Sequence, residues 1–223
     1  MTTPVIIFTV VYSLVLVAYF FTETSGKMYL RAPNKVLLAL MFFVFACIVF
    51  SIDDKFSLLS YHGLFMAGLF LAMLGDIFLL FDLNRGGDFF LAGNVCFIIY
   101  ELSVLSQHSI KFSEYWWVIL VSLVLLLTYY FLFTKFDKFF KMGKMKYPML
   151  FYLSSITLHG VMGIAVMIYV PSLLLLGLGS LLFFISDLIL TVDRFALKNN
   201  WSLRANSAFY FTGLLLMVLS MVV

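Results

Sequence analysis

Eight long runs of apolar residues dominate this 223-residue sequence and decide what it can fold into. A membrane-spanning helix needs roughly 20 mostly apolar residues. Hydrophobic residues make up 64% of the chain and charged residues 11%, whereas a soluble domain is typically about half apolar and a quarter charged. These values exclude a soluble globular domain, a disordered chain and a nucleic-acid-binding protein. The predicted spans are roughly 4–21, 35–51, 61–81, 89–107, 115–133, 147–170, 172–192 and 203–223.

The spans predict a single all-α domain over residues 1–223, a polytopic membrane bundle of eight transmembrane helices. A helix satisfies its own backbone in lipid, and no alternating pattern indicates a barrel. Cys47 and Cys96 lie inside apolar runs, which gives no disulfide framework and no metal-ligand spacing. We therefore expect no metal and no cofactor. The sequence leaves the oligomeric state open.

The distribution of Lys and Arg predicts the orientation of the spans. Of the 14 Lys and Arg residues, only Lys55 and Lys111 fall outside the four loops that follow spans one, three, five and seven. Loops rich in Lys and Arg face the cytoplasm. We therefore expect both termini to lie outside it. We also expect an integral multi-pass protein of a bacterial plasma membrane.

Two aspartates lie inside predicted spans, where an ionised side chain costs roughly 2.5–3.5 kcal/mol at the centre. Asp76 and Asp187 each precede the cytoplasmic end of their predicted span by five residues, so they are matched in depth. Gly68 and Gly179 lie on the same helical faces and permit close helix approach. Each carboxylate alone is compatible with helix packing. Together they predict a paired acid site, with one protonated carboxyl group beside an ionised one.

Both aspartates open an Asp-x5-Asp segment, which ends at Asp82 in the first case and at Asp193 in the second. The two segments are half a chain apart, and the second lies four spans after the first, so their spans run in the same direction. They are explained either by a parallel repeat of four plus four spans or by chance.

Two further ionisable residues lie near the middle of predicted spans. Glu101 lies twelve residues into the fourth span and His159 twelve residues into the sixth, so their depths match. A contact between them would offset the loss of water around each. Such a pair is equally compatible with a structural and a functional role. Asn94, Tyr152 and Tyr210 belong to polar stripes that predict a polar cavity within the bundle.

Three segments stand out: Gly75-Asp76-Ile-Phe-Leu-Leu, then Phe90-Leu-Ala-Gly93 with Phe97, then Gly179-Ser-Leu-Leu-Phe-Phe-Ile-Ser186-Asp187-Leu-Ile-Leu-Thr-Val-Asp193-Arg194-Phe195. They resemble the YhhN family of eight-span membrane proteins, whose characterised members are lysoplasmalogenases. The resemblance covers most of the chain from about Lys35 onward. Lys35 is similar to a family lysine at the start of the second span, and Tyr152 and Tyr210 are similar to family tyrosines.

Two positions depart from the family pattern. Glu101 stands where the family usually carries a histidine, and Gly213 stands where it often carries a glutamine. His159, on another span, is the candidate for the missing imidazole. If it does not take that role, the chain differs in substrate or has lost activity.

The resemblance implies hydrolysis of the vinyl ether bond of a lysoplasmalogen, an alkenyl-glycerophosphocholine or -ethanolamine. The products are a fatty aldehyde and a glycerophospho-base. One of Asp76 and Asp187 would act as general acid, and the other would stabilise the cation and activate water. Lys35 and Arg194 are candidate phosphate partners. We expect a lysophospholipid substrate and membrane lipids as partners.

The competing hypotheses are a transporter or lipid-binding protein and an inactive relative. Paired carboxylates within a membrane also serve proton relays, and parallel repeats occur in transport folds. Transporters commonly contain broken helices. The four prolines here all fall at the ends of predicted spans, which counts against transport.

Overall fold

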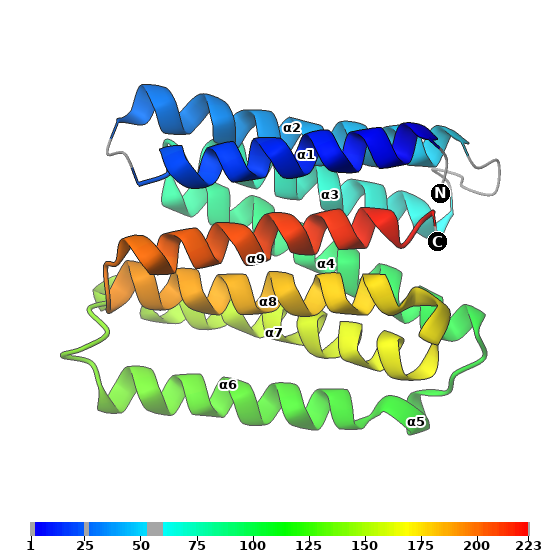
Figure 1. The fold of residues 1–223 in the computed structure, drawn as a ribbon. Coiled ribbons are helices and arrows are strands. Elements are labelled where there is room, and N and C mark those ends of the chain that lie inside the picture. Colours follow the sequence, from blue (N-terminus) through cyan, green and yellow to red (C-terminus); the bar gives the residue numbers. More distant parts are fainter. Residues whose placement is uncertain (1–2, 25–26, 53–59, 223) are drawn as a thin grey trace.

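In the computed structural model, which describes residues 3–24, 27–52 and 60–222, the chain forms a bundle of helices (Figure 1). Eight helical segments in these ranges are long and apolar enough to cross a membrane, and α5 and α6 together make one of them. The elements are α1 (Thr3–Thr22), α2 (Met28–Ile52), α3 (Tyr61–Phe78), α4 (Leu83–Gln107), α5 (Phe112–Tyr115), α6 (Trp117–Lys135), η1 (Gly143–Met145), α7 (Lys146–Tyr169), η2 (Pro171–Leu173), α8 (Leu174–Phe195) and α9 (Asn200–Leu219).

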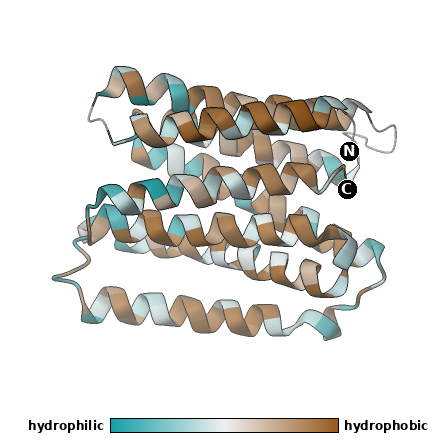
Figure 2. Cartoon of the chain, viewed as in Figure 1, coloured by the Kyte–Doolittle hydropathy of each residue, from teal (hydrophilic) through white to brown (hydrophobic). Residues whose placement is uncertain are grey.

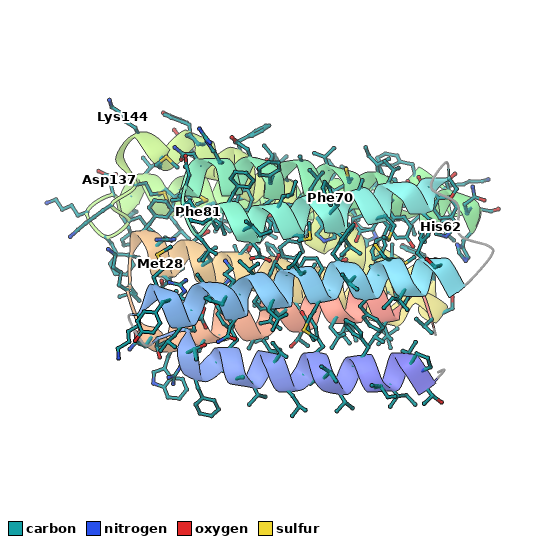
Figure 3. All side chains as sticks on the ribbon, turned by 90° about the horizontal axis from the view of Figure 1, so that it is seen from above. Met28, His62, Phe70, Phe81, Asp137 and Lys144 are labelled. Atoms are coloured by element: carbon teal, nitrogen blue, oxygen red, sulfur yellow. The ribbon has the colours of Figure 1, made fainter. Side chains whose placement is uncertain are left out.

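Successive spans run antiparallel, so the connections after α1, α3, α6 and α8 gather at one end of the bundle (Figure 1). We call it the basic end, defined by residues 23–24, 27, 79–82, 136–145 and 196–199. Figure 3 shows Met28, Phe81 and Lys144 at this end and His62 at the other. The middle of the bundle is mostly hydrophobic (Figure 2), as a lipid environment requires.

Helices α3, α4, α7, α8 and α9 form the packed centre, while α1 and α6 lie at the periphery and expose most of their apolar side chains. Glycines set the closest approach in this centre. A Cβ atom on Gly213 of α9 would lie 2.8 Å from the carbonyl oxygen of Gly179 on α8. No side chain fits there without moving one helix, because the obstacle is backbone. This crossing explains why position 213 holds a glycine.

Helices α2 and α4 begin well before their predicted starts, and this corrects the placement of several basic residues. Helix α2 begins at Met28 and not at 35, so Arg31 and Lys35 lie within a helix and not in a loop. Helix α4 likewise begins at Leu83 and contains Arg85. Hydropathy located the start of each apolar run. Both helices begin before that point, in turns that contain polar residues. The predicted position of Lys55 lies outside the described residues.

Pro33 also lies inside α2 and not at a span end. It is the sixth residue of the helix, so its missing N–H removes one backbone hydrogen bond close to the helix start. Helix α2 continues through this position to Ile52. The described part of the chain therefore shows no break at Pro33, and the reasoning against a broken helix stands.

The second aspartate of each Asp-x5-Asp segment has a structural role. Asp82 caps α4, where its Oδ1 accepts hydrogen bonds from the backbone N–H groups of Asn84 and Arg85. Asp193 accepts hydrogen bonds from the Asn199 N–H and the Ser202 hydroxyl, and so ties α8 to the start of α9. The parallel repeat stays a prediction.

The start of α1 and the end of α9 lie together at the end opposite the basic end (Figure 1). Positive loops favour the cytoplasm. A reporter fused after the last residue is therefore expected to be active only if it functions outside the cytoplasm. Fusion of a paired cytoplasmic and periplasmic reporter measures this directly. Activity of the cytoplasmic reporter would show that a span was miscounted.

Candidate functional site

A cavity of about 520 Å³ enters the bundle from the basic end. Residues from α1, α2, α3, α4, α7, α8 and α9 line it, together with residues that join α1 to α2, α3 to α4 and α8 to α9. Its size lies within the roughly 300–1,000 Å³ that is usual for small-molecule sites. Both aspartates singled out from the sequence line this cavity, and so do Lys35, Tyr152, Arg194 and Tyr210.

Asp76, on the last turn of α3, is almost fully buried and has two partners from other helices. The ammonium nitrogen of Lys35 on α2 lies 3.2 Å from its Oδ1 atom. The hydroxyl of Tyr210 on α9 donates a hydrogen bond of 2.7 Å to Oδ2. A buried carboxylate with a cation and a hydroxyl donor is stabilised in its ionised form. Lys35 is thus a partner of Asp76, and its assignment as a phosphate partner stays a prediction.

Asp187, on α8, is buried as deeply as Asp76 but is bound differently. Tyr152 of α7 donates a short hydrogen bond to Oδ2, and the Ser186 hydroxyl lies 3.4 Å from Oδ1. Among the ion pairs between described residues, none includes Asp187. The two aspartates therefore share a cavity but not an environment. Asp76 is paired with a cation, whereas the side-chain hydrogen-bond partners of Asp187 among the described residues are hydroxyl groups.

The prediction that both aspartates lie five residues inside a span is wrong in detail. Helix α3 ends at Phe78, three residues earlier than predicted, whereas α8 continues to Phe195. Residues 79–81 are as apolar as the helix before them but form turns that lead into the Asp82 cap. Hydropathy therefore placed the end of α3 too far along the chain. The two carboxylates nevertheless reach the same cavity.

The predicted contact between Glu101 of α4 and His159 of α7 is present. His159 Nδ1 lies 3.2 Å from Glu101 Oε2, and the Ser180 hydroxyl donates a hydrogen bond of 2.8 Å to Oε1. All three side chains are fully buried. None of them lines the cavity. The pair therefore connects α4, α7 and α8 inside the bundle.

Aromatic rings separate this pair from the cavity. The Phe183 ring centroid lies 5.8 Å from that of His159 on one side and 5.2 Å from that of Tyr210 on the other. Phe97 stacks on the His159 ring at 5.1 Å. His159 therefore does not bring into the cavity the imidazole that the resemblance led us to expect.

Asn94 also lies outside the cavity lining. It is fully buried on α4, and its side-chain amide donates a hydrogen bond of 3.3 Å to the Ser155 hydroxyl on α7. Ser155 in turn donates to the backbone carbonyl of Tyr152. Asn94 thus supports the turn of α7 that carries Tyr152, and it reaches the site only through that tyrosine.

Replacement of Glu101 by Leu is expected to lower the free energy of unfolding by about 3–5 kcal/mol, because it removes the acceptor of two buried groups. The double replacement of Glu101 by Leu and His159 by Phe is expected to recover much of that loss, since no buried polar ring is then left unpaired. Thermal unfolding in detergent measures both. A single variant as stable as the wild type would show that the pair is not a structural connection.

The mouth of the cavity carries most of its cations. Lys27, Arg31, Arg194 and Lys198 line it at the basic end, with Arg194 and Lys198 exposed. Glu23 lies among them but is only 4% exposed. Its Oε1 atom accepts hydrogen bonds from the hydroxyls of Tyr19 (3.2 Å) and Ser207 (2.5 Å). Burial raises the pKa of the Glu23 carboxyl, and these hydrogen bonds and nearby cations oppose that effect.

Sequence reasoning missed Glu23 and Arg31, because both fell in a segment that was predicted to be a loop. A signal was nevertheless present. Val5, Tyr12 and Tyr19 are the buried residues of α1 and recur every seven positions, which marks one helix face. Glu23 follows Tyr19 by four residues and continues that face into the bundle.

The sequence model of the YhhN family matches residues 30–221. The chain belongs to the YhhN family. Neither a curated protein nor a solved structure matches it. The match includes both buried aspartates and their partners Lys35, Tyr152 and Tyr210. Glu23 precedes the matched segment. Only its position in the cavity lining assigns it to the site of this YhhN family member.

Proposed function

We propose that this YhhN family member hydrolyses the vinyl ether bond of lysoplasmalogens to a fatty aldehyde and a glycerophospho-base. One observation carries the proposal: the buried carboxyl groups of Asp76 and Asp187 line the same cavity in different environments, and this cavity opens among cations. A vinyl ether is cleaved by a proton donor at carbon with a negative charge nearby. Asp187 and Asp76 are suited to these two roles.

In the first step the carboxyl group of Asp187 gives its proton to the β-carbon of the vinyl ether. The C=C electron pair forms the new C–H bond, and the α-carbon becomes part of an oxocarbenium ion. Asp187 is assigned as the acid because an ionised carboxylate here would lack a cationic partner. Tyr152 fixes the orientation of its carboxyl group.

In the second step water attacks the α-carbon and gives up a proton. Asp76, which Lys35 keeps ionised, stabilises the positive charge and orients the attacking water. Asp187, now a carboxylate, accepts the proton from that water and returns to its starting state. The resulting hemiacetal then collapses, with transfer of its hydroxyl proton to the departing glycerol oxygen. One water is consumed, and both carboxyl groups end as they began.

The test uses the purified protein in lipid nanodiscs and measures aldehyde release from a 1-alkenyl lysophospholipid. The saturated 1-alkyl analogue and the 1-acyl analogue serve as matched controls. We expect aldehyde from the alkenyl lipid, and no cleavage of either control, because neither forms an oxocarbenium ion on protonation at carbon. Absence of aldehyde would overturn the proposal and leave a transporter or an inactive relative as the alternatives.

A further inference from the structure

Two buried polar atoms at the mouth of the cavity have no hydrogen-bond partner among the described residues. One is Oε2 of Glu23, an acceptor, and the other is Nε of Arg31, a donor. Both residues line the cavity. Buried polar atoms are nearly always hydrogen-bonded in folded proteins, so each such atom calls for an explanation. A bound ligand that offers one donor and one acceptor would satisfy both.

The other Glu23 oxygen is already committed, because it accepts hydrogen bonds from Tyr19 and Ser207. Arg31 is close enough to influence the charge of Glu23, yet no ion pair between described residues joins them. The site therefore presents a fixed anion and a fixed cation side by side. Such a site is complementary to a zwitterionic ligand, which carries one positive and one negative charge.

Two helices place this pair one turn nearer to the basic end than the acid site. On α2, Arg31 precedes by four residues the Lys35 that pairs with Asp76. On α9, Ser207, which binds Glu23, precedes by three residues the Tyr210 that binds Asp76. Three to four residues of helix correspond to about 5–6 Å. The three-carbon glycerol unit between a vinyl ether oxygen and a phosphate covers a comparable length.

We propose that Glu23 and Arg31 form a headgroup subsite that selects a phosphate joined to a primary ammonium, as in the ethanolamine lysophospholipids. Arg31 binds the phosphate through charge-assisted hydrogen bonds. Glu23 accepts an N–H from the ammonium through its free oxygen. The inference rests on the proposed function for the position of the rest of the lipid.

The ammonium group is the point of selection. A primary ammonium carries three N–H donors, whereas a trimethylammonium carries none and is usually bound against open aromatic faces. Tyr19, the aromatic residue that contacts Glu23, is fully buried, and its ring packs edge-on against Phe211. The subsite thus provides an acceptor for an N–H, and the aromatic ring beside it in the described part of the chain has no open face.

The test is a binding measurement that requires no turnover. Saturated 1-alkyl lysophospholipids with ethanolamine or choline headgroups are titrated into the full-length protein in nanodiscs. We expect the ethanolamine lipid to bind about tenfold more tightly, since a hydrogen bond to a charged group typically contributes that much. Glu23→Gln is expected to abolish this difference, because the amide retains an acceptor for Tyr19 and Ser207 but loses the charge.

Three matched variants sharpen the result. Asp88→Asn removes the same charge from an exposed position on α4 that does not line the cavity, and it should keep the preference. Arg31→Gln should weaken both lipids by a similar factor, since the phosphate is common to them. Glu23→Asp keeps the charge but shortens the side chain, and an intermediate preference is expected even if Glu23→Gln fails to fold.

Equal affinity of the wild type for the two lipids would overturn the inference, and so would a preference that survives Glu23→Gln. Free glycerophosphoethanolamine forms a further arm, and binding as tight as that of the lipid would show a site for a soluble ligand. Because no hydrolysis is measured, a headgroup preference without aldehyde release would overturn only the proposed reaction. Aldehyde release without a preference would overturn only the subsite.

Discussion

Asp187→Asn is expected to lower the rate of aldehyde release at least about a hundredfold, because a positioned general acid typically contributes 10²–10⁴-fold. Asn keeps the shape of the side chain, and its amide oxygen accepts the Tyr152 hydrogen bond as the carboxyl oxygen does. It has no proton that it can transfer to carbon. Initial rates in nanodiscs, taken at equal amounts of folded protein, measure the effect.

The matched control is Asp82→Asn, the same substitution at the end of the other Asp-x5-Asp segment, which opens at Asp76. Asp82 is partly exposed, does not line the cavity and caps α4, a role that Asn fills well. Aldehyde release should stay near the wild-type rate. If Asp187→Asn retains that rate as well, Asp187 is a packing residue and the acid lies elsewhere.

Asp76→Asn is expected to change both activity and stability. Activity should fall at least about a hundredfold, because the charge that stabilises the oxocarbenium ion is lost. Stability should fall by about 3–5 kcal/mol, because the Lys35 ammonium, whose side chain is only 12% exposed, is left without its carboxylate. Thermal unfolding and initial rates measure the two effects separately.

The double variant Lys35→Met with Asp76→Asn separates structure from catalysis. It removes both members of the ion pair, and similar-sized neutral groups replace them, so stability should return toward the wild-type value. Activity should not return. Turnover near the wild-type rate in the double variant would show that the ion pair only holds α2 to α3, and that Asp187 acts alone.

The fold could be predicted from the sequence because hydropathy over 20 residues is a strong signal and lipid permits few architectures. The helix ends could not be predicted in the same way, because α2 and α4 begin in polar turns that precede their apolar runs. The family prediction rested mainly on the segment around Asp187, which forms α8, and the family match bears it out.

The site was predictable only in part. Asp76 and Asp187 were found because a carboxylate inside a span is rare and usually faces the bundle interior. Equal depth correctly predicted that Glu101 meets His159. Depth does not report which way a helix face turns, however, so the separation of that pair from the cavity by Phe183 could not be foreseen. Glu23 lay outside every predicted span.

The central claim is that a carboxyl proton is transferred to carbon, and hydrolysis in D₂O tests it most directly. Exchangeable carboxyl protons are then deuterons, so each aldehyde molecule, trapped at once by reduction, should carry one deuterium on the carbon next to the former carbonyl. The rate should also fall relative to H₂O. Wild-type aldehyde that carries only hydrogen on that carbon would contradict the account.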